Sequence, residues 1–116
     1  MNALIIVNDP PYDTERAYNA LRLAIELAKR PGHAVRVFLM GGAVACAQRG
    51  QRTARGYYNL ENMLRALVIQ GGEVALCSSC MDARGQPETE VVEGAHRSSM
   101  QELTDWTIAA DRVVSF

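Results

Sequence analysis

The sequence is poor in cysteine and in net charge. It has only three cysteines among 116 residues, Cys46, Cys77 and Cys80, and an odd number cannot close the disulfide framework of a small secreted domain. Twelve basic and 13 acidic residues give a net charge near −1, which provides no general attraction to nucleic acid or to an anionic membrane. We therefore expect a reducing cytoplasm as the environment and no direct nucleic-acid partner.

Long apolar runs are also missing, so no segment is predicted to cross a bilayer. The amino-terminal run at residues 3–7 is too short for the apolar region of a signal peptide, and no basic leader precedes it. Nearly half of the residues, 48%, are nevertheless hydrophobic. A chain of this size and composition is predicted to bury one core as a single domain over residues 1–116.

Short apolar runs alternate with segments of helical periodicity. The β-branched and apolar runs predict strands at residues 4–7, 35–40, 73–76 and 112–116. Helical spacing predicts a first helix that Asp13 or Thr14 caps and a second that Asn59 caps. Shorter helices are expected at 43–47 and 81–84, and the Ser99–Glu102 capping box predicts a last helix at 100–109.

Strands that alternate with helices pair mostly in parallel, through right-handed crossovers. The predicted fold is therefore an α/β three-layer sandwich with a mostly parallel sheet of four to five strands. In such sheets, ligands and chemistry collect beyond the carboxyl ends of the strands. Cys46 follows the second expected strand, and Cys77 and Cys80 follow the third, so all three thiols are expected at that edge.

Cys77 and Cys80 form a Cys-x-x-Cys motif where an apolar strand ends and a short helix begins. Unpaired backbone N–H groups at a helix start favour an anionic sulfur. Such a thiolate can accept sulfur from a persulfide donor and pass it to an acceptor thiol. Cys80 can instead attack a persulfide on Cys77, which releases sulfide and closes a disulfide. Both mechanisms stay open at this point, with Cys46 as a further candidate.

These cysteines and glycines have other interpretations. A free cysteine often serves as a small buried hydrophobe, and this alternative is strongest for Cys46. Three cysteines with His33 or His96 could form a zinc site, but only one Cys-x-x-Cys pair is present and neither histidine has a ligand partner nearby. Gly41–Gly42 and Gly71–Gly72 match no phosphate-binding pattern and indicate turns. No metal and no cofactor are therefore predicted.

Three arginines, Arg49, Arg52 and Arg55, lie beside Tyr57 and Tyr58 in a polar segment. The simplest interpretation is a solvated loop. Contact with an anion or with a partner is the alternative.

Taken together, segments spread over the whole chain make it resemble the DsrE/DsrF-like sulfur-relay proteins. These segments are Ile5-Ile6-Val7-Asn8-Asp9-Pro10-Pro11-Tyr12, Val37-Phe38-Leu39-Met40-Gly41, Gly56-Tyr57-Tyr58-Asn59, Cys77-x-x-Cys80-Met81-Asp82-Ala83-Arg84-Gly85 and the last helix with Trp106. The resemblance implies a Rossmann-like or flavodoxin-like DsrE fold, protein donors and acceptors of sulfur, and assembly into a homotrimer or homohexamer.

The resemblance also implies a role for one cysteine. The family's sulfur-carrying cysteine stands eight residues before a glycine at the end of a short helix, and Cys77 stands eight residues before Gly85. Cys80 and Cys46 are additional to the family's best-understood relay subunits. We therefore predict a cytoplasmic sulfur-relay protein that accepts a persulfide on Cys77. The competing hypothesis is an oligomeric, non-catalytic scaffold that holds a small ligand near inert thiols.

The last helix spreads its apolar residues over an arc wider than packing on one sheet requires. It contains Trp106, the only tryptophan, and large aromatic residues are enriched in interface cores. Trp106 can therefore lie in the core of one chain or between chains. The family resemblance favours the second position, with the cysteines near subunit boundaries.

Overall fold

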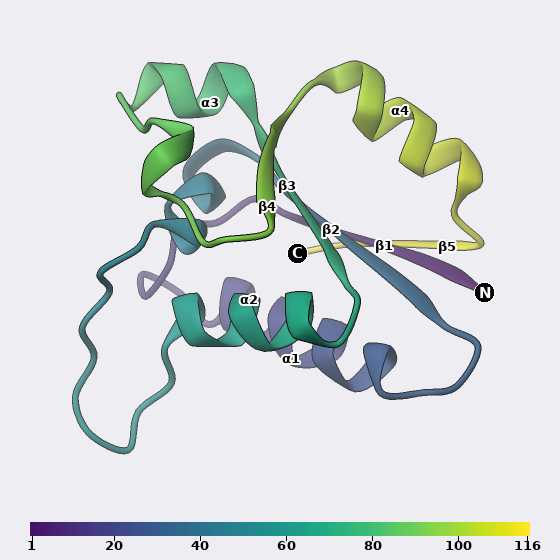
Figure 1. Ribbon diagram of the computed structural model, residues 1–116, viewed down its shortest axis with the longest axis horizontal. Coiled ribbons are helices and arrows are strands. Elements are labelled where there is room, and N and C mark those ends of the chain that lie inside the picture. The colour runs from purple at the N-terminus through teal and green to yellow at the C-terminus, as the bar shows by residue number, and fades with distance from the viewer.

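Five parallel strands form the sheet at the centre of the molecule (Figure 1). The computed structural model describes all residues from 1 to 116. The strands are β1 (Asn2–Val7), β2 (Ala34–Leu39), β3 (Glu73–Cys77), β4 (Ala95–Ser98) and β5 (Arg112–Ser115), in the order β4-β3-β2-β1-β5. Every neighbouring pair is parallel, which confirms the predicted α/β fold with its parallel sheet.

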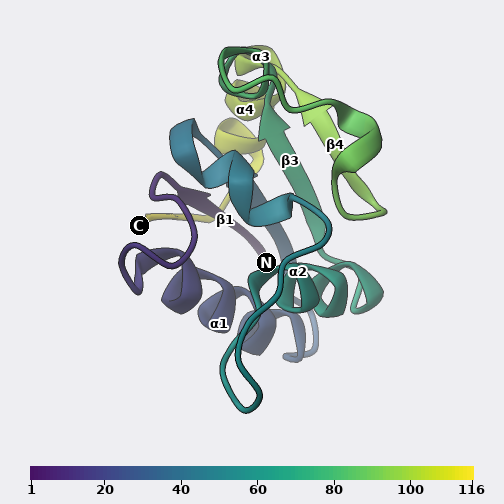
Figure 2. The same cartoon turned by 90° about the vertical axis from the view of Figure 1, so that its left-hand side faces the viewer.

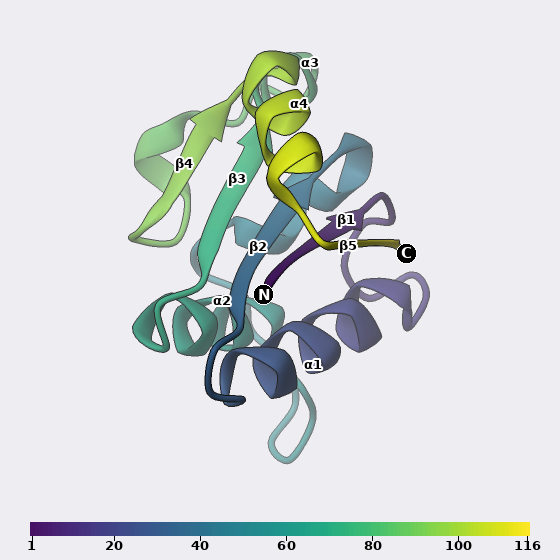
Figure 3. The same ribbon diagram turned by 90° about the vertical axis from the view of Figure 1, so that its right-hand side faces the viewer.

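Helices cover both faces of this sheet. Helices α1 (Arg16–Ala28) and α2 (Leu60–Ile69) lie on one face, and α4 (Met100–Ala109) crosses the other (Figures 1 and 3). The shorter elements are the 3-10 helix η1 (Gly41–Ala47), α3 (Ser78–Ala83) and the 3-10 turn η2 (Glu88–Glu90). Because η1 and α3 directly follow β2 and β3, they lie at the carboxyl edge of the sheet. No helix is long and apolar enough to span a membrane.

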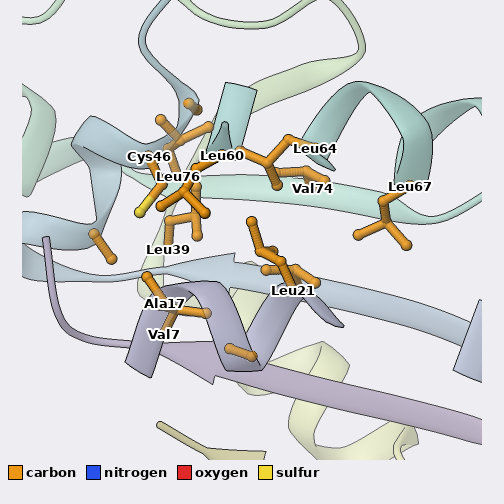
Figure 4. Close-up of a cluster of buried hydrophobic side chains, with 14 of the residues drawn as sticks. Val7, Ala17, Leu21, Leu39, Cys46, Leu60, Leu64, Leu67, Val74 and Leu76 are labelled. Carbon is orange, nitrogen blue, oxygen red and sulfur yellow. The ribbon is translucent and has the colours of Figure 1, made fainter. Parts of the chain in front are cut away.

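Each face of the sheet has its own apolar core. The larger core contains 21 buried residues and lies between the sheet and helices α1 and α2; some of its side chains are drawn in Figure 4. The smaller core lies under α4 and consists of Leu4, Phe38, Ala75, Leu103 and Trp106. Side chains alternate between the two faces along β1, β2 and β3, as the period of a strand requires.

Trp106 belongs to the core of a single chain. Its side chain is only 6% exposed, its ring meets Phe38 edge to face at 6.1 Å, and the Arg36 guanidinium lies 5.2 Å from the ring centroid. The expectation that Trp106 lies between subunits is therefore wrong. The large exposed apolar residues of α4 are Met100 and Ile108 instead.

The predicted helix starts were right for α2 and in part wrong for α1. The Asn59 side chain caps α2 by accepting a hydrogen bond from the Asn62 N–H at 3.0 Å. Helix α1 begins at Arg16, and Glu15 occupies its cap position without a capping side-chain bond. Thr14, one of the two predicted caps, instead donates to Asp9 at 2.8 Å and weakly accepts the Arg16 N–H at 3.3 Å.

Three further features of the carboxyl-terminal half differ from the sequence predictions. Helix α3 begins at Ser78, three residues before the predicted start, and Cys77 is its cap residue. Strand β4 was not predicted, because its sequence Ala-His-Arg-Ser has no apolar run. Ser99 caps α4 as expected, but the Glu102 carboxylate binds Ser98 and His96 instead of completing the capping box.

Replacing Trp106 with alanine tests the second core. We expect Trp106→Ala to lower the free energy of unfolding by about 3–5 kcal/mol, because a large buried ring is removed from both Phe38 and Arg36. Ile108→Ala on the same helix is the matched control, since Ile108 is 79% exposed, and should change stability by less than about 0.5 kcal/mol. Urea unfolding followed by circular dichroism measures both. Equal effects of the two substitutions would contradict the assignment of Trp106 to the core.

Candidate functional site

The site lies where β2 and β3 end together. Leu39 pairs with Leu76 in the parallel register, so the next residues, Met40 and Cys77, lie at the same level where the two strands end. Helix α3 then rises over the end of β3, beside β4 (Figure 2). Its Met81 side chain is fully buried in the larger core. This anchor helps to turn the chain back over the sheet and leaves Cys77 and Cys80 partly exposed.

Cys77 is partly exposed and its sulfur lies in a polar environment. The Cys77 Sγ lies 3.3 Å from the Ser79 Oγ, and the Cys80 thiol and the backbone N–H groups of Ser79 and Cys80 act on its pKa as hydrogen-bonding neighbours. Partial burial alone would raise the pKa of Cys77. The hydrogen bonds outweigh burial, so the pKa of Cys77 lies below its ordinary value. Cys77 is therefore the thiol of this chain that ionises most readily.

Cys80 is the protonated partner in this pair. Its bond to the Cys77 sulfur raises the pKa of Cys80, and partial burial adds to this effect, while the Gly41 N–H acts in the opposite direction. That N–H donates to the Cys80 Sγ at 3.1 Å. The contact joins the start of η1 to α3, two segments 39 residues apart. It places Cys80 between a backbone donor and the more acidic sulfur of Cys77.

Cys46 lies in the larger core and not at the surface. It has no exposed area, and Figure 4 shows its sulfur among Leu76 and other apolar side chains. Burial raises the pKa of Cys46 to about 12. A thiol that stays protonated at neutral pH and has no access to solvent is poorly suited to attack a donor.

Contacts on two sides hold α3 in place. The buried Gln86 side chain, just beyond α3, donates to the Val44 carbonyl of η1 at 3.0 Å. On the other side, Arg97 of β4 binds both carboxylate oxygens of Asp82 at 2.7 Å. This pair is exposed, so its main effect is to fix geometry. Cys80 is thus carried on a helix that is tied to both neighbouring segments.

A polar cluster that the sequence did not reveal stands beside Cys77. Ser98 of β4 is the register partner of Cys77, and its hydroxyl donates to Glu102 at 2.6 Å. The His96 Nε2 lies 2.5 Å from the same carboxylate oxygen. Partial burial raises the pKa of Glu102, but the bonds from Ser98 and His96 outweigh it, so that the pKa lies below its usual range. The cluster fastens β4 to α4 next to the thiol pair.

The two thiols are half-buried and lie outside the surface hollows of the chain. The chain has four surface hollows, and no cysteine lines any of them. No three His, Cys, Asp or Glu side chains converge in a way that could hold a metal ion. His96 is bonded to Glu102 and His33 to the Pro31 carbonyl, so the zinc alternative has no supporting geometry. What the arrangement offers is a pair of accessible thiols with unequal acidity.

Comparison with known proteins agrees with this fold and these motifs. The model of the DsrE/DsrF-like family matches residues 1–116. The chain belongs to the DsrE/DsrF-like family. Membership supports a role of the sulfur-relay type in general.

Relatives in bacteria and archaea match nearly the whole of this DsrE/DsrF-like chain. It is 39% identical over 114 residues to protein YchN of Escherichia coli K12, with 97% of each chain covered. It is 34% identical to the uncharacterized protein MJ0989 of Methanocaldococcus jannaschii, with both chains fully covered. The crystal structure of YchN from E. coli superposes with a TM-score of 0.92 over all of both chains.

A more distant structure shares the fold alone. MTH1491 from Methanobacterium thermoautotrophicum, described as a protein of unknown function, is 15% identical and matches with a TM-score of 0.76 over 99% of this chain and 98% of its own. The DsrE fold therefore persists where little sequence is shared.

The thiols are expected to differ in their reactivity. Iodoacetamide should label Cys77 first, and its rate should rise with pH to half its maximum below the ordinary thiol pKa of about 8.5, because only the thiolate reacts. Cys46 should stay unlabelled in the folded protein. Ser79→Ala should shift the Cys77 profile to higher pH, since one hydrogen bond to the sulfur is lost. Peptide mass mapping gives all three rates, and equal slow labelling of the three cysteines would contradict the assignment.

Proposed function

We propose that this protein carries sulfane sulfur as a persulfide on Cys77, between a protein donor and a protein acceptor. One observation supports the proposal above the others: Cys77 is a partly exposed thiol at the carboxyl edge of the sheet, and its neighbours Ser79 and Cys80 lower its pKa. A sulfur carrier needs an accessible sulfur that bears negative charge at neutral pH. The sulfur-relay character of the family is consistent with this role.

Loading is a thiol–disulfide type of exchange in which atoms and electrons balance. The Cys77 thiolate attacks the terminal sulfur of a donor persulfide, R–S–SH, and a new S–S bond forms on Cys77. The donor S–S bond breaks, and its electron pair leaves with R–S⁻. Unloading is the same step in reverse, with an acceptor thiolate as the nucleophile. Hydrogen-bond donors around Cys77 stabilise the anionic sulfur before loading and after unloading.

The contact between Cys80 and Cys77 supports a second outcome at the same site. After it loses its proton, Cys80 can attack the Cys77 sulfur that carries the persulfide. This closes a Cys77–Cys80 disulfide and releases sulfide as HS⁻: two thiol sulfurs are oxidised and the sulfane sulfur is reduced. An external dithiol must then reduce the disulfide before another cycle. The raised pKa of Cys80 favours simple transfer at neutral pH and the reductive branch at higher pH.

The scaffold hypothesis makes a different demand on the structure. A ligand held near inert thiols needs a hollow beside them, and the four hollows of this chain lie elsewhere. A partly exposed thiol outside every hollow suits a reaction partner that brings its own thiol to the site. We therefore favour the carrier over the scaffold.

Persulfide loading is the direct test. After incubation with a persulfide donor, the intact mass should rise by one sulfur atom, and Cys77→Ser should abolish the gain with little loss of stability. Cys80→Ser should still load but should form no internal disulfide and release no sulfide. Cys46→Ala is the control for loss of a thiol outside the site and should load like the original chain. Absence of any gain in the unsubstituted protein would favour the scaffold, and loss of loading in Cys80→Ser alone would make Cys80 the carrier.

A further inference from the structure

A thioether side chain stands beside the thiol pair where β2 and β3 end. Met40 and Cys77 directly follow the register partners Leu39 and Leu76, so their backbones are neighbours about 5 Å apart across the sheet. Both side chains are half-buried, and both pack against the smaller core under α4. Met40 is therefore the neighbour of Cys77 on the side of β2 and lies on the same face of the sheet.

Cys80 approaches the same point from α3. Its sulfur accepts the N–H of Gly41 at 3.1 Å, and Gly41 is the residue that follows Met40. The thiols of Cys77 and Cys80 are also hydrogen-bonding neighbours of each other. The fold thus gathers two thiols and one thioether side chain, from two segments far apart in sequence, at one edge of the sheet.

The spacing of the two thiols suits a bound ion. Two metal–sulfur bonds of about 2.3 Å each set the sulfurs about 4.0 Å apart at a trigonal ion and about 4.6 Å apart at a linear one. Thiols that are already close enough to hydrogen-bond need little movement to reach either spacing. The Cys77–Cys80 pair can therefore chelate one ion without rearrangement of the sheet.

The type of ligand decides which ion fits. Thiolate and thioether sulfurs are soft ligands and select Cu(I), whereas structural zinc takes four ligands. No three His, Cys, Asp or Glu side chains converge in this chain, so zinc lacks the ligands it needs. Cu(I) is satisfied by two or three soft ligands. The sequence-based prediction of no metal was made against zinc and does not extend to such an ion.

Hard ions are disfavoured because the two carboxylates beside the thiols are already engaged. Both oxygens of Asp82, two residues after Cys80, are bound by Arg97 at 2.7 Å. The Glu102 carboxylate is bonded by Ser98 and His96. Magnesium, calcium and manganese require oxygen ligands. The ligand set next to the thiols is therefore one of sulfur alone.

We propose that Cys77 and Cys80 bind one Cu(I) ion as thiolates, with the Met40 sulfur as a third, neutral ligand. Two protons leave to solvent, and neither copper nor sulfur changes its oxidation state. The resulting complex has a charge of −1, which the Gly41 N–H beside the Cys80 sulfur stabilises.

The position of the thiols indicates that the ion is passed on and not stored. Both thiols are partly exposed, and no hollow of the chain encloses them. An incoming thiolate can replace the weakly held thioether and then take the ion by ligand exchange. This binding goes beyond the proposed sulfur transfer, because a persulfide needs only Cys77 whereas Cu(I) needs both thiols.

A competition titration tests the site. The reduced full-length chain is titrated under anaerobic conditions with Cu(I) held by the coloured chelator bicinchoninate, and it should withdraw one ion per chain. Cys77→Ser and Cys80→Ser should each lower the affinity by more than about a hundredfold, since loss of a group that only supports a ligand already costs about 10–100-fold. Cys46→Ala is the control for loss of a buried thiol and should bind like the original chain.

Met40→Leu tests the third ligand, because it removes the sulfur but nearly keeps the volume. It should weaken binding about tenfold, the size expected of a secondary contact to a metal. X-ray absorption should count three sulfur neighbours of copper in the original chain and two in this variant. Met63→Leu is the matched control, since Met63 is also half-buried but packs in the core on the other face, and it should leave the affinity unchanged.

Three results would overturn the inference. They are failure of the original chain to withdraw copper from the chelator, binding by Cys80→Ser as tight as by the original chain, and unchanged affinity in Met40→Leu. Persulfide loading is measured on the same variants without copper. A chain that loads sulfur but binds no Cu(I) overturns this inference alone, and a chain that binds Cu(I) but loads no sulfur overturns the proposed function alone.

Discussion

The parallel pairing of β2 with β3 is the interaction on which the thiol site depends. It brings two segments far apart in sequence to the same level at the sheet edge, so that the Gly41 N–H meets the Cys80 sulfur. A shift of one residue in the register would turn every side chain of β3 to the opposite face. The buried Val74, Ala75 and Leu76 prevent such a shift, because each fills a core on its own side. The acidity of Cys77 is thus a consequence of core packing several residues away.

Much of this arrangement could be predicted from sequence, because local signals determine it. Strands β1, β2 and β3 are buried on both faces and appear as short apolar runs, and the caps at Asn59 and Ser99 are visible within four residues of sequence. The rule that parallel strands end at a common edge then placed all three cysteines at that edge. Only two of them reach the surface there. Whether a side chain after a strand points outward or into the core depends on the helix that follows, and η1 turns Cys46 inward.

The remaining features depend on contacts between distant segments. Strand β4 is held by its pairing with β3 and by the Arg97–Asp82 and Ser98–Glu102 bonds, none of which leaves an apolar pattern in its sequence. The width of the apolar arc on α4 did not reveal that Arg36, from β2, would lie over Trp106 and complete its burial. The Ser99–Glu102 spacing matched a capping box, yet His96 and Ser98 compete for the carboxylate. In each case a partner distant in sequence or an unforeseen strand decided the outcome.

The persulfide proposed for Cys77 would lie outside every hollow of the surface, which has a consequence for its lifetime. Small thiols in the surrounding solution could approach the exposed side of the sulfur by the same route as a dedicated acceptor. Selectivity must then be kinetic: the correct acceptor has to dock and react before an unspecific thiol arrives. A carrier of this kind would work best when its sulfur resides briefly, and its throughput would be set by how often partners meet it rather than by how tightly it holds sulfur.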